Sequence, residues 1–185
     1  MNMATIGTLS SRYARAFYAY ALDSNEEDKV YDEMKFLLHS YLFVPELKKF
    51  LQSPVLTLET KIQALETASG GNVTKSSRQF YEFVFDKEKH DLLLYIASAY
   101  LSVYRKAKNL VYVDLITAVE PDNEFIDSIK NHILKEYNDN TIIEISISID
   151  PDIIGGFILN VDGKQLDLSI KGELKNLRKS ILKNL

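Results

Sequence analysis

The spacing of apolar residues changes its period once along the chain, and this change limits the possible folds. Up to about Asn109, apolar side chains recur at the three- and four-residue intervals of helices, whereas β-branched residues alternate with polar ones beyond it. We therefore predict a mainly α protein of the α+β class. An N-terminal helical domain at 1–109 would precede a small C-terminal α/β domain at 110–185.

Start and stop signals divide the first domain into six segments, which predicts a six-helix bundle. Ser10 or Ser11 would cap a first helix over residues 13–22. Ser24 and Glu27 form a capping box, so a second helix is expected to start there and to end near residue 41. The remaining signals are Pro45, Thr57 and Thr74 as helix starts, Gly70-Gly71 as the end of the fourth helix, and apolar spacing over residues 92–106.

The second domain reads as strand, helix, strand, hairpin and helix. The alternating runs Val111–Val119 and Ile143–Ile149 predict two half-buried strands, and Asp122 would cap the helix between them. That helix carries an apolar stripe of Ile126, Ile129, Ile133 and Tyr137. Two further strands at 157–161 and 164–168 would be joined by the turn Asp162-Gly163, before a terminal helix with Ile170, Leu174, Leu177 and Ile181 on one side.

Charge and composition exclude several classes of protein. The 22 basic and 26 acidic residues give a net charge of -4, so no general attraction to nucleic acid is expected. The two domains differ, because 1–109 has 14 basic and 13 acidic residues while 110–185 has 8 and 13. Without cysteine, the chain has no disulfide, zinc-thiolate site or cysteine nucleophile. We also expect no signal peptide and no membrane-spanning helix.

No arrangement of polar residues has the spacing of a catalytic, cofactor or metal site. His39, His90 and His132 are isolated from one another, and neither glycine pair lies in a phosphate-binding context. The carboxylate pairs Glu26/Glu27 and Asp150/Asp152 are interpreted as solvated caps or turns rather than acid-base machinery. We therefore expect no catalytic residues, no cofactor and no metal.

Two helices of the first domain carry more apolar and aromatic side chains than one buried face needs. The first helix shows apolar character nearly all round, broken by Arg15, and the fifth has an aromatic cluster around residues 80–85. These aromatics either fill the core of a domain that has no tryptophan or form a surface that binds a partner helix.

The terminal helix sets five basic residues and one acidic residue against its apolar stripe. The stripe is suited to covering the predicted sheet, and we favour that interpretation. The alternatives are docking of a partner helix and binding to an anionic lipid surface.

Several segments are distinctive enough to indicate a family. They are Ser11-Arg12-Tyr13-Ala14-Arg15-Ala16-Phe17, Ser53-Pro54-Val55-Leu56, Ile153-Ile154-Gly155-Gly156-Phe157-Ile158-Leu159, and Asp167 with Ser169 before Leu174 and Leu177. In this order and over nearly the whole chain, they resemble the delta subunit of bacterial F-type ATP synthase, whose mitochondrial counterpart is the oligomycin-sensitivity-conferring protein. Two positions depart from the family pattern: Glu88 stands where many members have glycine, and Asn160 stands where the residue is often basic.

The resemblance implies a non-catalytic connector of the stator, which resists rotor torque during ATP synthesis and proton transport. The N-terminal domain would hold the N-terminal helix of an alpha subunit between its first and fifth helices, through Tyr13, Ala16, Phe17, Tyr20, Phe80, Phe83 and Val84. The C-terminal domain would hold the peripheral-stalk b subunits near Gly155, Gly156, Leu174 and Leu177. The implied location is peripheral, on the cytoplasmic face of the bacterial inner membrane, with membrane association only through the complex.

Two hypotheses from other classes make different predictions. A small enzyme using carboxylates of the second domain would need a concave pocket with convergent acidic groups. A peripheral membrane-surface protein using its basic C-terminal helix would bind liposomes in a salt-sensitive way.

Overall fold

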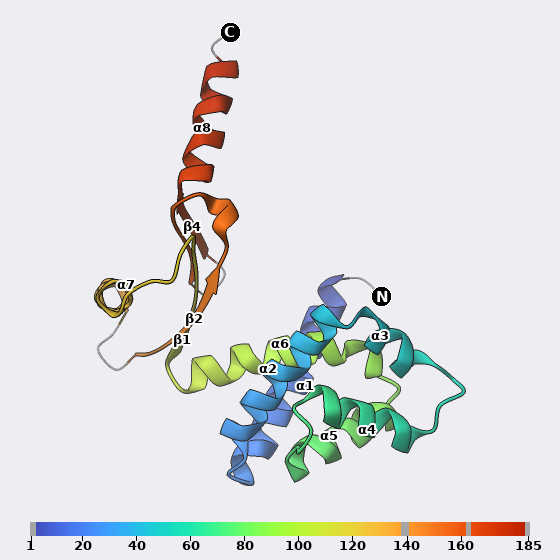
Figure 1. The fold of residues 1–185 in the computed structure, drawn as a ribbon. Helices are drawn as coiled ribbons and strands as arrows, with labels where there is room; N and C mark the ends of the chain where they lie inside the picture. The colour runs from blue at the N-terminus through green and yellow to red at the C-terminus, as the bar shows by residue number, and fades with distance from the viewer. Residues whose placement is uncertain (1–2, 138–140, 162–163, 184–185) are drawn as a thin grey trace. The chain divides into compact units, whose positions relative to one another are not determined.

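The chain forms a mainly helical protein with one small C-terminal sheet (Figure 1). The computed structural model describes residues 3–137, 141–161 and 164–183. The chain divides into two compact units, Met1–Lys106 and Ala107–Leu185, and the expected boundary at 109/110 lies three residues after this division. The α+β class and the small C-terminal sheet are confirmed.

The first unit is built from helices that start and stop where local chemistry requires. They are α1 (Met3–Asp23), α2 (Glu27–Phe43), α3 (Pro45–Gln52), α4 (Leu58–Ala68), α5 (Lys75–Asp86), the 3-10 turn η1 (His90–Leu92) and α6 (Leu93–Ala107). The side chains of Thr57 and Thr74 accept the amides of Thr60 and Ser77, which confirms both predicted caps. Pro45 occupies the first turn of α3, and Gly70 follows α4 at a φ of +107°.

Two predicted helix starts are wrong. Helix α1 begins at Met3 rather than after Ser10 or Ser11, and Ser10 is buried within it. The capping box of Ser24 and Glu27 does not form, because Asn25 adopts a left-handed φ of 54° and no side chain caps α2. The backbone amides of residues 24–26 instead bond carbonyls of the last turn of α1, so this segment closes α1.

Aromatic packing forms the centre of the first unit. Phe17 of α1 stacks on Phe80 of α5 at 3.9 Å and meets Tyr100 of α6 at 5.0 Å between ring centroids. Tyr81 is fully buried, and its hydroxyl bonds that of Ser69 at 2.6 Å. Because the large aromatic side chains interlock three helices, the core is well filled without tryptophan.

The second unit is a four-stranded sheet with two helices, one between the two parallel strands in sequence and one after the last strand. Its elements are β1 (Leu110–Thr117), α7 (Asn123–Glu136), β2 (Ile142–Ile149), η2 (Pro151–Ile153), β3 (Gly156–Val161), β4 (Lys164–Ser169) and α8 (Ile170–Lys183). The strand order is β2-β1-β3-β4, with β1 and β2 parallel and the other pairs antiparallel. Asp122 caps α7 through the amide of Phe125, as predicted.

One face of the sheet packs against α7. Val111, Val113 and Leu115 of β1, with Leu159 of β3 and Ile133 of α7, form the core of the unit. Strand β1 ends at Thr117, so the predicted extension to Val119 is wrong, and that side chain is 73% exposed. The predicted Asp162-Gly163 turn lies outside the described residues.

The terminal helix does not cover the sheet, which corrects our favoured interpretation of its stripe. Helix α8 follows β4 without a connecting residue, and Leu174 and Leu177 are 55% and 60% exposed. Its most extensive contacts with other elements are those with β4 and η2, and Figure 1 shows it leading away from the strands. The predicted stripe position Ile181 lies outside the residues whose side chains are described.

Candidate functional site

The structure brings together the two sets of residues predicted on the first and fifth helices. Helices α1 and α5 contact each other. The ring centroids of Tyr13 and Phe83 lie 6.0 Å apart, and those of Phe80 and Phe83 lie 6.5 Å apart. We call this surface the α1–α5 face; it consists of Tyr13, Ala16, Phe17, Tyr20, Phe80, Phe83 and Val84.

The α1–α5 face has a buried layer and an exposed layer. Phe17, Phe80 and Val84 are between 0% and 8% exposed, so they belong to the core. Tyr20 and Phe83 are 45% and 46% exposed. Ala16 is exposed and Tyr13 is half-buried. The core interpretation therefore holds for Phe17 and Phe80, whereas Tyr20 and Phe83 lie on the surface, where a partner helix could contact them.

Other contacts explain why helix α1 looks apolar nearly all round. Tyr18 makes edge contacts with Tyr100 and Tyr104 of α6, at centroid distances of 6.0 and 6.3 Å. A second side of α1 is therefore packed within the first unit. The apolar side chains that remain exposed on α1 include Tyr20 and Leu22, and Tyr20 donates a hydrogen bond to the side-chain oxygen of Gln79 on α5.

Two carboxylates, one on α2 and one on the residue just before it, hold the first turn of α5. Glu33, which is only 7% exposed, accepts the backbone N–H of Thr74 at 2.6 Å and also the hydroxyls of Thr74 and Ser77. Glu26 accepts the backbone N–H of Ser76 at 3.0 Å. Carboxylates at a helix N-terminus satisfy its unpaired amides and interact favourably with the helix dipole. These contacts fix the start of the helix that carries Phe80 and Phe83.

The two carboxylates have opposite pKa shifts. Burial raises the pKa of Glu33, and the hydrogen bonds from Ser77 and Thr74 only partly oppose it. The hydrogen bonds from Ser76 lower the pKa of Glu26, which is little desolvated. The sequence pattern predicts Glu26 as part of a solvated pair and does not single out Glu33. The available signal was that Glu33 lies between Val30 and Leu37 on the apolar side of α2.

In the second unit, the predicted glycine pair makes a close backbone approach. Gly156 has a φ of +73°, and a Cβ there would lie 2.2 Å from the carbonyl oxygen of Leu168. The carbonyl of Gly155 accepts the amide of Ile170 at 3.0 Å. Only glycine fits position 156, and the pair holds β3 against the junction of β4 and α8.

The Asp-x-Ser segment caps α8. Asp167 accepts the amide and the hydroxyl of Ser169 at 3.0 and 2.6 Å, and Ser169 accepts the amide of Gly172 at 3.0 Å. The bonds from Ser169 lower the pKa of Asp167. This arrangement fixes the direction in which α8 leaves the sheet. The predicted residues Leu174 and Leu177 lie on α8, and the glycine pair lies at its base.

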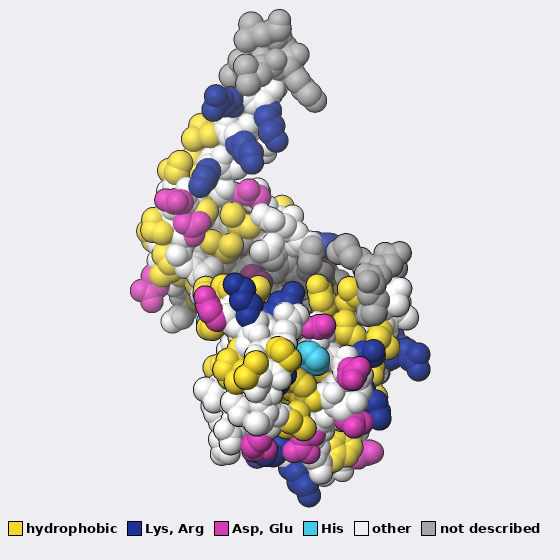
Figure 2. Space-filling view, turned by 90° about the vertical axis from the view of Figure 1, so that its right-hand side faces the viewer, with side chains coloured by type: hydrophobic (Ala, Val, Ile, Leu, Met, Phe, Trp, Pro, Cys, Tyr) yellow, Lys and Arg dark blue, Asp and Glu magenta, His cyan; other side chains and the backbone are white. Residues whose placement is uncertain are grey.

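Helix α8 exposes both basic and apolar side chains along its length. Figure 2 shows Lys and Arg side chains gathered along it beside apolar ones. The described apolar side chains Ile170, Leu174 and Leu177 are 45%, 55% and 60% exposed. Such a stripe is suited to a partner helix.

The described residues contain no group of three or more His, Cys, Asp and Glu side chains that could hold a metal ion. In the same part of the chain, no helix has the length and apolar character needed to span a bilayer. His90 stacks on Phe85 at 5.1 Å and His39 on Phe43 at 4.2 Å between ring centroids, and His132 is exposed.

Comparison with known proteins gives a consistent result. Residues 9–181 match the family described as ATP synthase delta (OSCP) subunit. Similar proteins include ATP synthase subunit delta of Parabacteroides distasonis, 35% identical over 97% of this chain and 98% of that protein. The same subunit of Bacteroides thetaiotaomicron is 36% identical over 96% and 95% of the two chains. A chain in the structure of the Toxoplasma gondii mitochondrial ATP synthase hexamer shares the fold, with a TM-score of 0.67, 21% identity, and coverage of 94% and 97%.

Proposed function

This chain belongs to the ATP synthase delta (OSCP) subunit family, and we propose that its first unit holds the N-terminal segment of an alpha subunit while its second unit holds the peripheral-stalk b subunits. As a delta subunit, it is a non-catalytic linking subunit of the stator. In this proposal the first unit acts as a six-helix bundle on the catalytic hexamer. The complex would place the subunit on the cytoplasmic face of a bacterial inner membrane.

The mechanical task explains why no catalytic group is needed. A rotor driven by ion flow exerts torque on the catalytic hexamer, and the hexamer would turn with it unless a connector held it still. Such a connector needs contacts that dissociate slowly. Buried aromatic anchors meet this need better than surface ion pairs, which contribute at most about 1 kcal/mol each.

The observation that carries the proposal for the alpha subunit is the two-layered α1–α5 face. Exposed Phe83 and Tyr20 lie above a layer of buried Phe17 and Phe80, so the exposed rings are supported from below. A partner helix that covered them would bury rings that are already positioned, with little ordering cost. Exposed rings on a rigid base are typical of helix-binding surfaces.

The test is binding of a synthetic peptide with the cognate alpha-subunit N-terminal sequence to the full-length chain, measured by isothermal titration. Phe83 is 46% exposed, so binding could bury about 90 Å² of a ring residue of about 200 Å². At about 25 cal/mol/Å² this area contributes about 2 kcal/mol. We therefore expect Phe83→Ala to weaken binding roughly 30-fold.

Phe36→Ala is the matched control, because Phe36 is also an exposed phenylalanine, at 58%, but lies on α2. We expect this variant to bind the peptide like the wild type. Ala16→Glu adds a second test, since it places a charge within the α1–α5 face on a helix where glutamate is well tolerated. Wild-type affinity in both Phe83→Ala and Ala16→Glu would contradict the proposed surface.

The proposal for the b subunits rests on the exposed α8 stripe and its glycine-fixed base. Leu177→Asp should weaken binding of the cytoplasmic segment of the b subunit without affecting binding of the alpha peptide. Binding of α8 to lipid is the competing interpretation. Co-sedimentation of the wild-type chain with anionic liposomes at low salt would reveal lipid binding. Unchanged binding of the b segment by the Leu177→Asp variant would also favour the lipid interpretation.

A further inference from the structure

The sheet of the second unit is covered by helix on only part of one face. Strands lie about 4.8 Å apart and a helix is about 10 Å wide, so one helix covers roughly two strands of four. Helix α7 packs on the centre of the sheet, where Val113, Leu115 and Leu159 are buried. On the edge strand β4, Leu166 and Leu168 share this face by register and are 50% and 47% exposed.

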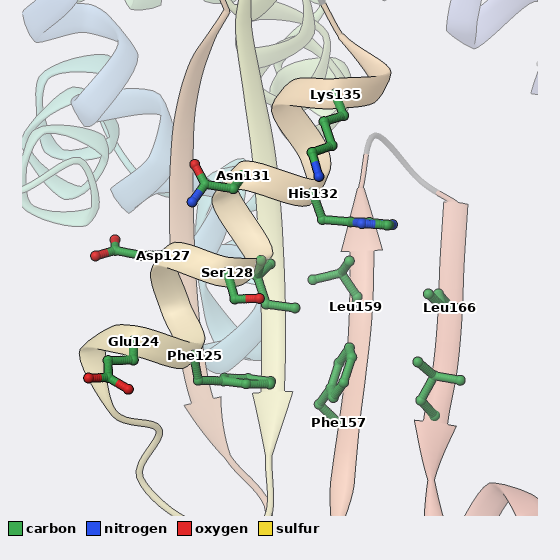
Figure 3. Close-up of a pocket in the computed structure, with 12 residues that line it drawn as sticks. Glu124, Phe125, Asp127, Ser128, Asn131, His132, Lys135, Phe157, Leu159 and Leu166 are labelled. Atoms are coloured by element: carbon green, nitrogen blue, oxygen red, sulfur yellow. The ribbon is translucent and has the colours of Figure 1, made fainter.

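The uncovered part of the face is an open depression between α7 and the β3–β4 hairpin, with a volume of about 760 Å³ (Figure 3). We call it the α7–β4 depression. Phe157 and Leu159 of β3 and Leu166 and Leu168 of β4 form its strand side, and Phe125 of α7 points toward them. A six-residue strand is about 20 Å long. The apolar surface along β4 therefore has the length of about four turns of helix.

Helix α8 of the same chain is not the occupant. It begins at Ile170 directly after β4, and its first turn is capped by Ser169. Without linker residues, α8 cannot reverse over the strand that it follows. A helix seated in the depression is therefore not α8 of the same chain.

The charge at one end of the depression defines the helix that would fit there. Lys135 and His132 lie at the end where β3 and β4 join, and Figure 3 shows His132 pointing over the strands. Lys164 is exposed at the same end and, by the alternation of β4, on the same face as Leu166. Glu124 and Asp127 point away from the strands in Figure 3. Among the described residues, the charged side chains at this end of the depression are therefore cationic.

A cationic end favours the C-terminal end of a helix, where the dipole is negative, and carboxylates in its last turn. It disfavours a basic helix. The terminal helix α8 has Lys171, Lys175, Arg178 and Lys179, so α8 of a second copy has the wrong charge for this end. Both its own α8 and that of a neighbouring copy are thus poor occupants.

We propose that the α7–β4 depression binds an amphipathic helix of the peripheral stalk whose acidic end meets Lys135 and Lys164, as a docking surface separate from the α8 stripe. The assignment of the helix to the stalk rests on the proposed function. The surface and its charge preference rest on the exposed leucines and the lysines that border them.

The experiment is photo-crosslinking in the assembled ATP synthase, with a benzophenone amino acid at position 166 in the depression, at 177 on α8 or at 42 on α2. Leu42 is a control because it is 67% exposed and lies in the first unit. We expect positions 166 and 177 to crosslink to a b subunit and position 42 not to. Crosslinking from 177 without 166 would overturn the proposed surface, as would a delta–delta product from 166. No b product from either position would contradict the proposed function itself.

Charge reversal tests the polarity of the site. Lys135→Glu and Lys164→Glu should each weaken binding of the cytoplasmic b segment about tenfold and reduce its salt dependence. Lys130→Glu is the matched control on the same helix, because Lys130 lies near Asp127 and does not line the depression. Equal effects of Lys130→Glu and Lys135→Glu would show that the attraction is general rather than local, and would overturn the assignment of an acidic helix end.

Discussion

Replacing Glu33 tests how the first turn of α5 is held. Glu33→Ala removes the acceptor for the Thr74 amide and for two hydroxyls, one of them on Ser77, which is fully buried. A buried donor left without an acceptor costs about 1–3 kcal/mol. If one or two of these three donors are left buried without a partner, the unfolding free energy falls by about 2–4 kcal/mol.

Thermal unfolding followed by circular dichroism measures the effect. For a chain of this size, 1 kcal/mol corresponds to about 2–4 °C, so Glu33→Ala should lower the melting temperature by roughly 5–15 °C. Asp32→Ala is the control, because Asp32 is the exposed neighbour on α2. The melting temperature of Glu33→Gln should lie between those of Glu33→Ala and Asp32→Ala, since an amide keeps an acceptor for the Thr74 N–H.

The pH dependence gives a second readout. The folded pKa of Glu33 is raised above 4.5 by burial, so the stability that its protonated form provides is complete below pH 4.5 and is lost as the pH rises through the raised pKa. A glutamine does not titrate. The melting temperature of Glu33→Gln should therefore rise relative to that of the wild type as the pH increases through this window.

The melting temperature of Glu26→Gln, relative to that of the wild type, should show the opposite dependence on pH. Its lowered folded pKa means that ionised Glu26 contributes stability above pH 4.5, and that the contribution is lost as the pH falls through the lowered value. If Glu33→Ala melted like Asp32→Ala at every pH, the anchoring of α5 by Glu33 would be refuted. Parallel curves for Glu33→Gln and Glu26→Gln would refute the assignment of opposite shifts.

Three further substitutions test local geometry. Glu88 has a left-handed φ of 53°, so Glu88→Gly should stabilise the chain by about 1 kcal/mol in urea unfolding; a loss would show that its side chain makes a needed contact. Gly156→Ala should cost roughly 2–4 kcal/mol and reduce b-segment binding while alpha-peptide binding is kept, because its Cβ would meet the Leu168 carbonyl. Ser169→Ala should cost about 1 kcal/mol and speed amide exchange at Gly172, and unchanged exchange would contradict the cap.

Signals that act within a few residues could be predicted from the sequence. Thr57, Thr74 and Asp122 cap helices as expected, because an N-cap needs only its own side chain and an amide two or three residues ahead. The capping box at Ser24 failed although its local pattern was complete. Glu26, two residues later, bonds Ser76, which lies 50 residues away, and a contact of that range has no local signature.

Periodicity identifies an apolar face but not what covers it. Phe17 and Phe83 were selected by the same argument, yet one is 1% exposed and the other 46%. The difference arises because Tyr100 of α6 packs against Phe17. For the same reason the apolar stripe of α8 alone wrongly predicts that this helix covers the sheet. Helix α8 cannot pack on the sheet because no connecting residue follows Ser169, and the apolar spacing of α8 does not show where β4 ends.

The buried carboxylate at α5 is best understood together with the exposed face on the same helix. A connector under torque must not lose its binding surface by local opening, and exposed aromatic rings contribute little to holding their own helix in place. Glu33 of α2 and Glu26 just before that helix hold the first turn of α5, and Phe80 stacks on Phe17 one turn later. The stability of α5 is thus supplied by residues that no partner needs to touch. Phe83 can remain exposed for binding because the helix beneath it is fixed by polar contacts at its start and by buried rings along its inner side.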